Sequence, residues 1–258
     1  MRVLHFSDPH VQLPRWRERK LRDLGPLRAI ASAELWRGRG ALYEGAVDAL
    51  RAIVRDADRL RADWIICTGD LTQLAMEEEF ALAREALLPI WGRLTCIPGN
   101  HDRYPFDDGS HNRLFEQYFH GLPLRPPDEL SLFVLDSCGP VCWPIITRGH
   151  VPSAELAGLS ERIEAARGCK LVLLHHSPLL RNGRPDFVWH ALKDAHAVLR
   201  AAAPADAILC GHLHERFEIR ATSRVFCAGS STERGKEGYF VFELDGHIQS
   251  AQVRRPGA

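Results

Sequence analysis

The stretch Gly211-His212-Leu213-His214 follows Ala207-Ile208-Leu209-Cys210, a short apolar run that predicts a buried strand. Two imidazoles at i and i+2 just past a strand end can turn toward the same side, and the glycine lets the backbone turn sharply. A sheet can present a pair of metal ligands in this way. An isolated His-x-His is more often surface or core histidine, so the interpretation depends on the rest of the chain.

Four other stretches repeat this pattern of an apolar strand followed by a loop of Asp, His, Asn and Gly. They are Ser7-Asp8-Pro9-His10 after residues 3–6, Thr68-Gly69-Asp70 after 64–67, Pro98-Gly99-Asn100-His101-Asp102 after 94–97, and Leu174-His175-His176-Ser177-Pro178 after 170–173. Each has an ordinary explanation alone, since a Gly-Asp after a strand is usually a turn. Together they place five ligand-bearing loops at the carboxyl ends of predicted strands, where open α/β sheets bind ligands.

The donor types in these loops indicate which metals they suit. Mixed oxygen and nitrogen donors from Asp, Asn and His favour Mn, Fe, Co or Zn over Ca. The set is larger than one ion needs, so the sequence predicts two divalent metal ions.

Strands alternate with helical patterns along most of the chain, which predicts an α/β layered fold. The expected strands are 3–6, 64–68, 94–98, 130–136, 170–175 and 207–210, and the expected helices are 44–60, 77–88, 153–166 and 190–202, with Ser153 as a helix N-cap. Four short strands follow at 216–221, 224–228, 239–244 and 248–253, with Asp245-Gly246 as a hairpin turn. Antiparallel strands therefore end the chain, and we expect one domain over residues 1–258.

Composition restricts the class of protein. The chain is 45% hydrophobic and 26% charged with a formal net charge of zero, so it is globular and offers no bulk electrostatic attraction for nucleic acid. It has no apolar run long enough to span a membrane, and its first residues do not resemble a signal peptide. The seven cysteines include no CxxC pair, which predicts reduced, buried thiols in a cytoplasmic protein.

Two segments stand apart from the motifs. Residues 15–40 form a basic insertion, which is either a solvated, partly helical surface or a rim that attracts an anionic substrate between two ligand loops. Residues 179–190 form a variable loop directly after a ligand loop, and its Arg181 and Arg184 are candidates for substrate binding. Exposed arginines are more often solvated surface.

The ordered set Asp8-x-His10, Gly69-Asp70, Gly99-Asn100-His101-Asp102, His175 and Gly211-His212-x-His214 resembles the calcineurin-like metallophosphoesterase superfamily. The His175-His176-x-Pro178 form most resembles its bacterial cyclic-nucleotide and glycerophosphodiester phosphodiesterase branch, although the connection from His10 to Asp70 is longer than is usual there. The resemblance implies a four-layer α-β-β-α sandwich of two mixed β-sheets flanked by helices. It also implies a dinuclear metal centre at the strand ends.

The same resemblance implies a role for each motif residue. Asp8, His10 and His214 would hold the first metal, Asp70 would bridge both metals, and Asn100, His175 and His212 would hold the second. His101 would be the histidine that binds no metal and lies close to the scissile phosphate, and Asn100 and His101 would both bind the substrate. His176 would be a core residue or a neighbour of the ligands.

The expected chemistry is hydrolysis of a small organic phosphate diester, cyclic or linear. Two divalent ions lower the pKa of a shared water, and the resulting hydroxide attacks phosphorus in line while the ions neutralise the developing charge. His101 could protonate the leaving oxygen. With Asp70, it completes the predicted catalytic set.

Alternatives remain open. The chain could be a phosphomonoesterase, or a nucleotide-lipid pyrophosphatase, which needs an apolar groove. A nuclease is disfavoured by the zero net charge. A scaffold that has lost catalysis is disfavoured because no motif residue is missing. We expect a small phosphate ester as the partner, and a monomer or homodimer.

Overall fold

The computed structural model describes residues 1–13, 28, 32–33, 35–104, 113–122, 125–139 and 147–258. Most of the basic insertion at 15–40 lies outside the described residues. Of its arginines, Arg28 is buried and its Nε donates a hydrogen bond to the Leu74 carbonyl at 2.9 Å. The interpretation of the insertion as a solvated surface therefore does not hold at Arg28.

The first sheet has five strands in the order β10-β9-β1-β2-β3. β1 (Arg2–Phe6), β2 (Trp64–Cys67) and β3 (Leu94–Cys96) run parallel, β9 (Tyr239–Asp245) is antiparallel to β1, and β10 (His247–Arg254) is antiparallel to β9. The predicted Asp245-Gly246 turn joins β9 to β10, and Gly246 has φ 69°. A left-handed backbone of this kind is the reason a glycine is favoured in such a turn.

The second sheet has the order β4-β5-β6-β8-β7. β4 (Leu130–Val134), β5 (Cys169–His176), β6 (Ala207–Gly211) and β8 (Arg224–Cys227) run parallel, and β7 (Phe217–Arg220) is antiparallel to β8. Both sheets are therefore mixed, as predicted.

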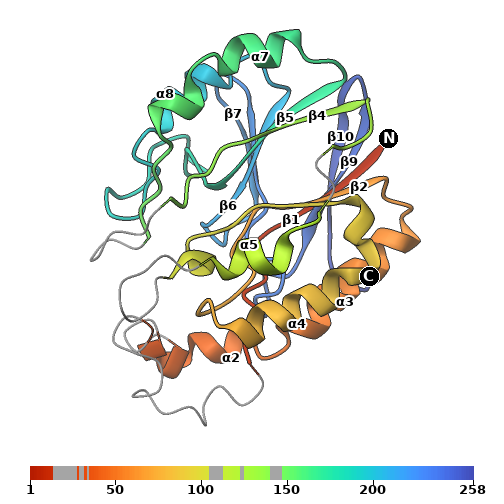
Figure 1. The fold of residues 1–258 in the computed structure, drawn as a ribbon, viewed down its shortest axis with the longest axis vertical. Helices are drawn as coiled ribbons and strands as arrows, with labels where there is room; N and C mark the ends of the chain where they lie inside the picture. Colours follow the sequence, from red (N-terminus) through yellow and green to blue (C-terminus); the bar gives the residue numbers. More distant parts are fainter. Residues whose placement is uncertain (14–27, 29–31, 34, 105–112, 123–124, 140–146) are drawn as a thin grey trace.

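Helices cover the outer face of each sheet (Figure 1). α3 (Ala46–Arg59), α4 (Glu77–Leu87) and α5 (Leu114–Phe119) lie on the first sheet, and α6 (Ser153–Leu156), α7 (Leu159–Ala165) and α8 (Ala195–Ala201) lie on the second. Between the sheets, the fully buried side chains of Ile66, Leu171 and Phe226 belong to one core cluster. This order confirms the four-layer α-β-β-α sandwich. Both faces of the strands are covered, which explains their continuous apolar runs.

Helix boundaries differ most from the prediction. The single helix expected over 153–166 is two helices, because Gly158 adopts φ 64° between α6 and α7. Ser153 is the first helical residue rather than the N-cap, a position held by Pro152. The helix expected from residue 190 begins only at Ala195.

Short helical turns complete the described secondary structure. They are η3 (Leu35–Arg39), α2 (Gly40–Leu42), η4 (Leu88–Arg93) and η5 (His101–Arg103). Among the residues that the structure describes, no helix is both long enough and apolar enough to cross a bilayer. The described cysteines are free thiols, and all except Cys96 are buried.

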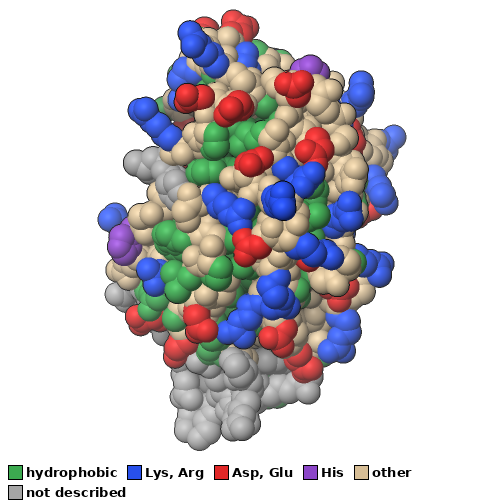
Figure 2. Space-filling view, turned by 90° about the vertical axis from the view of Figure 1, so that its right-hand side faces the viewer, with side chains coloured by type: hydrophobic (Ala, Val, Ile, Leu, Met, Phe, Trp, Pro, Cys, Tyr) green, Lys and Arg blue, Asp and Glu red, His purple; other side chains and the backbone are tan. Residues whose placement is uncertain are grey.

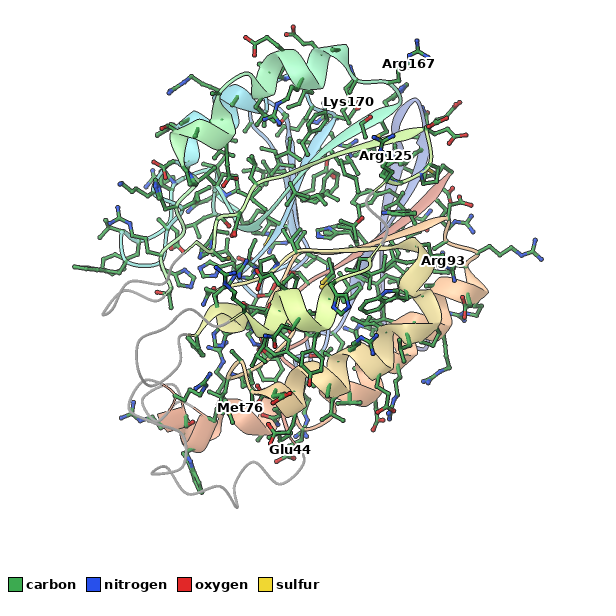
Figure 3. All side chains as sticks on the ribbon, viewed as in Figure 1. Glu44, Met76, Arg93, Arg125, Arg167 and Lys170 are labelled. Carbon is green, nitrogen blue, oxygen red and sulfur yellow. The ribbon has the colours of Figure 1, made fainter. Side chains whose placement is uncertain are left out.

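Charged side chains of both signs are interspersed on the side of the molecule shown in Figure 2, which agrees with the zero net charge. In Figure 3, Arg93 and Lys170 lie near the amino-terminal ends of β3 and β5. The loops with the predicted ligands lie at the opposite, carboxyl-terminal ends of these strands.

Candidate metal centre

Four of the predicted ligand loops follow β1, β2, β3 and β6, whereas His175 and His176 are the last two residues of β5, so both sheets contribute to one site. Hydrogen bonds donated by backbone amides hold the loops together: the Asp8 amide donates to the Gly69 carbonyl at 2.9 Å, and the His212 amide donates to the Asp8 side-chain carboxylate at 3.0 Å. The second bond joins residues that are 204 positions apart in the chain. The two sheets are therefore linked directly at the site.

A first cluster of donor atoms comes from Asp8, His10, Asp70 and His214, with one ligand atom of each within 4.8 Å of the others. The Nε2 atoms of His10 and His214 are 3.0 Å apart. Nε2 of His214 lies 3.4 Å from Oδ1 of Asp8, and Nε2 of His10 lies 3.6 Å from Oδ2 of Asp70. Imidazole and carboxylate lone pairs that converge so closely in a buried site fit a divalent cation.

A second cluster forms around Asn100. Its Oδ1 lies 3.2 Å from Nε2 of His175 and 3.1 Å from Nδ1 of His212. Nε2 of His175 also lies 3.4 Å from Oδ2 of Asp70. Oδ2 of Asp70 is therefore close to both clusters, through His10 in one and His175 in the other, which suits a bridging carboxylate between two ions.

Main-chain carbonyls orient two of the histidines. Nδ1 of His175 donates to the Thr68 carbonyl at 2.8 Å, and Nε2 of His212 donates to the His190 carbonyl at 3.1 Å. In each ring, the remaining nitrogen faces the second cluster, and in the neutral ring this nitrogen carries the lone pair. Hydrogen bonds of this kind fix the tautomer of metal-ligating histidines.

His214 is oriented by two residues that the sequence analysis missed. Its Nδ1 lies 3.1 Å from Oε2 of Glu233 and 2.8 Å from the Tyr43 hydroxyl, and that hydroxyl donates to Glu233 at 3.2 Å. Burial alone would raise the pKa of Glu233, but hydrogen bonds from His214 and Lys236 lower it to about 2. Neither residue belongs to a motif, so no local pattern marks them.

The backbone at the site is strained. Seven non-glycine residues of the described chain have positive φ, and five of them are predicted ligands: Asp8 (50°), His10 (44°), Asp70 (53°), His212 (72°) and His214 (53°). L-residues rarely adopt this conformation, and its concentration in one place is typical of functional sites.

The glycines next to the ligands allow close approach. A Cβ on Gly211 would collide with the Asp8 carboxylate and with Ser7, and a Cβ on Gly99 would collide with the Asp70 side chain. Gly211 itself does not have positive φ. It is therefore required for space and not for the sharp turn that the sequence suggested.

His101 lies beside the first cluster, with its ring centroid 4.7 Å from that of His10. Its amide donates to Oδ1 of Asp70 at 2.8 Å, which leaves Oδ2 of Asp70 for the clusters. Its Nδ1 donates to the Gln73 carbonyl at 2.8 Å, so Nε2 is the edge of the ring that can act on another group. Burial lowers the pKa of His101.

The acidic charge at the centre is maintained by the histidines. Burial alone would raise the pKa of Asp70, but its electrostatic interactions with His175 and His101 and its hydrogen bond with His175 hold that pKa well below its usual range. Asp70 is therefore a carboxylate over the whole physiological pH range, which is the form that a metal ligand needs.

Asp102 holds the third loop against the second. Its carboxylate accepts hydrogen bonds from the amides of Gly99 at 2.9 Å, Leu71 at 3.0 Å and Thr72 at 2.9 Å, and from the Thr72 hydroxyl at 2.8 Å. The motif therefore contains a structural aspartate beside the predicted ligand Asn100.

The remaining predicted residues belong to neither cluster, although the His176 ring lies 4.3 Å from that of His212. Nδ1 of His176 is 3.0 Å from the Ser137 hydroxyl, which agrees with a core position. Arg181 is exposed and pairs with Glu215 at 2.9 Å. Within the described residues, no hydrogen bond joins the guanidinium of Arg181 or Arg184 to either cluster.

Comparison with known proteins shows the family of the chain. The family model described as calcineurin-like phosphoesterase matches residues 1–216, and the chain belongs to this family. Among solved structures, a dimetal phosphatase from Danio rerio has a TM-score of 0.63 at 12% identity over 99% of both chains. The purple acid phosphatase of yellow lupin seeds has a TM-score of 0.58 at 12% identity, over 98% of this chain and 53% of that one. At such identities the likeness shows the fold.

Two curated relatives share more of the sequence. The chain is 26% identical over 223 residues to the 3',5'-cyclic adenosine monophosphate phosphodiesterase CpdA of Haemophilus influenzae, which covers 75% of this chain and 74% of that protein. It is 23% identical over 245 residues to CpdA of Escherichia coli, covering 90% of this chain and 76% of that protein.

Proposed function

We propose that this protein is a dinuclear metal-dependent phosphodiesterase that hydrolyses small organic phosphate diesters, with cyclic nucleotides as the first candidates. The observation that carries the proposal is Oδ2 of Asp70, which lies 3.6 Å from Nε2 of His10 and 3.4 Å from Nε2 of His175 and so belongs to both donor clusters. The similarity to two CpdA proteins supports the preference for diesters.

The residues that would hold the metals fall into two sets that share one carboxylate. The first set is Asp8, His10, Asp70 and His214, and the second is Asp70, Asn100, His175 and His212. These donors suit Mn, Fe, Zn or Co. When bound, two such ions supply an activated water near neutral pH and neutralise charge on the phosphate oxygens.

The protein's own contribution is positioning and hydrogen bonding. Oδ1 of Asn100 faces His175 and His212, so its amide nitrogen can donate to a phosphate oxygen. The Nδ1 hydrogen of His101 is held by Gln73, which presents Nε2 to the phosphate or to the leaving oxygen. The seven predicted ligands, which include Asn100, would thus act with His101 within one buried site.

Phosphomonoester or pyrophosphate hydrolysis is the second candidate, because the same metal centre can serve each of these reactions. A single domain, a monomeric or dimeric state and a cytoplasmic location stay predictions from the sequence, as does binding of the substrate by Arg181 and Arg184. A scaffold without catalysis is disfavoured, because all seven predicted ligands converge.

The test compares hydrolysis of bis(p-nitrophenyl) phosphate and p-nitrophenyl phosphate by Mn-loaded protein, with Asp70→Asn as the control. Preference for the diester, abolished in the control, would support the proposal. Preference for the monoester would replace it with phosphatase activity. Two bound metals with no turnover of either ester would contradict phosphodiesterase function and favour a scaffold.

A further inference from the structure

The variable loop at 179–190 reaches the metal centre through His190 and not through its arginines. The His190 ring stacks on the ring of His212, with centroids 4.0 Å apart and an angle of 26° between the planes. The carbonyl of His190 also accepts the hydrogen bond from Nε2 of His212. Ring and backbone of His190 are therefore both fixed to a predicted ligand of the second metal.

Asp186 sets the orientation of the His190 ring. Its carboxylate Oδ2 accepts a hydrogen bond from Nδ1 of His190, four residues later. In the neutral ring this bond places the hydrogen on Nδ1 and the lone pair on Nε2. The His190 side chain is 39% exposed, and no hydrogen bond to Nε2 occurs among the described residues.

We infer that His190 is a specificity-determining residue of this site, whose Nε2 accepts a hydrogen bond from a hydroxyl group on the ester part of the substrate. Asp186 is a positioning residue that acts through His190. The inference rests on the proposed function. The substrate class is a phosphate diester with a free hydroxyl beside an esterified carbon, as in a ribose or glycerol ester.

The position of His190 supports this assignment. The His190 ring stacks on His212, which belongs to the second cluster. An organic group attached to a phosphate at the proposed metal centre would therefore lie next to His190. The same segment exposes Phe187 (67%) and Trp189 (52%), which offer apolar surface to the organic part of such an ester. A site that has placed a hydrogen-bond acceptor discriminates against an analogue that lacks the matching donor.

The test uses 3',5'-cyclic AMP and its 2'-deoxy analogue, which differ only in the hydroxyl beside the esterified 3' carbon. For the metal-loaded wild type, we expect kcat/KM to be about 10-fold higher for the ribose substrate. In His190→Phe, which keeps a ring against His212 and removes the acceptor, this ratio should fall to about one. Asp186→Ala should lower the ratio in the same direction but less, because the ring remains while its orientation is released.

Two further readouts separate the causes of failure. Metal content by mass spectrometry and the circular dichroism spectrum report whether each variant is folded and loaded. Binding of adenosine 3'-monophosphate and its 2'-deoxy analogue, which keep the phosphate on the 3' carbon, is measured by calorimetry and gives the corresponding ratio without turnover. If the wild type hydrolyses no diester, the proposed function fails, while the binding ratio still tests His190.

A wild-type ratio near one, in both turnover and binding, would overturn the assignment of His190. So would an unchanged ratio in a folded, metal-loaded His190→Phe variant. A rise in KM for both nucleotides with the ratio preserved would also overturn it, since that result means contact with the phosphate and not with the hydroxyl.

Discussion

Oε2 of Glu233 lies 3.1 Å from Nδ1 of His214, across the ring from Nε2, the atom that faces His10 in the first cluster of donor atoms. This carboxylate fixes the tautomer of His214 so that Nε2 carries the lone pair, 3.0 Å from Nε2 of His10. Glu233 is buried and also pairs with Lys236 at 2.6 Å. A residue outside every motif therefore controls a predicted ligand.

Replacing Glu233 with alanine should weaken metal binding at the first cluster by roughly 10- to 100-fold, because His214 loses the acceptor that orients it. Glu233→Gln keeps an oxygen that accepts the bond and should retain most of the affinity. Calorimetric titration of the metal-free protein with Mn measures both variants. Glu218→Gln, at an exposed site on β7, is the matched control, and equal affinities in Glu233→Ala and wild type would contradict the role.

Gly211→Ala should disrupt the first cluster, because the new Cβ would overlap with the Asp8 carboxylate and with Ser7. We expect a loss of about 1–3 kcal/mol in the free energy of unfolding and a lower metal content. Urea denaturation and elemental analysis measure the two effects. Gly92→Ala is the control, since its added Cβ meets nothing within 4 Å. A fully loaded and stable Gly211→Ala protein would show that the loop can shift without harm.

Asp102→Asn should destabilise the second and third ligand loops together. The asparagine has one acceptor oxygen, and its amide would face backbone amides that now donate to the carboxylate, such as those of Leu71 and Gly99. Leaving such buried donors unpaired should lower the free energy of unfolding by about 2–3 kcal/mol. Chemical denaturation of the metal-free protein measures this directly, without the contribution of bound metal. A change below about 0.5 kcal/mol would mean that water replaces the lost acceptor.

His5 should make stability depend on pH. It is fully buried, with Nε2 3.0 Å from the Thr68 hydroxyl, and burial, with Arg216 nearby, lowers its pKa to about 3. An unfolded histidine titrates near ~6.5, so below that pH the unfolded state binds a proton that the folded state does not. Stability therefore falls as pH falls from ~6.5 toward 3.

Between about pH 7 and about pH 5, wild type should lose about 2 kcal/mol more stability than His5→Gln, which cannot be protonated. Urea denaturation at the two pH values gives the difference. His247→Gln, at an exposed position on β10, should keep the wild-type pH dependence. Parallel losses in wild type and His5→Gln would mean that the buried ring becomes protonated without unfolding.

The prediction of the fold succeeded where information is local. Apolar runs such as those of β2 and β5, each followed by a ligand loop, placed strands within a few residues of their observed limits. The alternation of these strands with helical patterns then predicted the layered α/β architecture. The prediction of a single helix over 153–166 was wrong. A glycine can occur inside a helix, so the sequence did not mark Gly158 as a break, and only its left-handed backbone conformation in the structure separates the two helices.

The sequence by itself determined the types and order of the predicted ligands, because strand, loop and donor residues are neighbours in the chain. Only the tertiary structure decided which atoms meet: Oδ2 of Asp70 between two clusters, Glu233 on His214, and His190 on His212. These contacts join ordinary residues far apart in sequence, and no one-dimensional pattern records them. The same holds for the positive φ angles at Asp8 and His10, which the packing of the loops imposes.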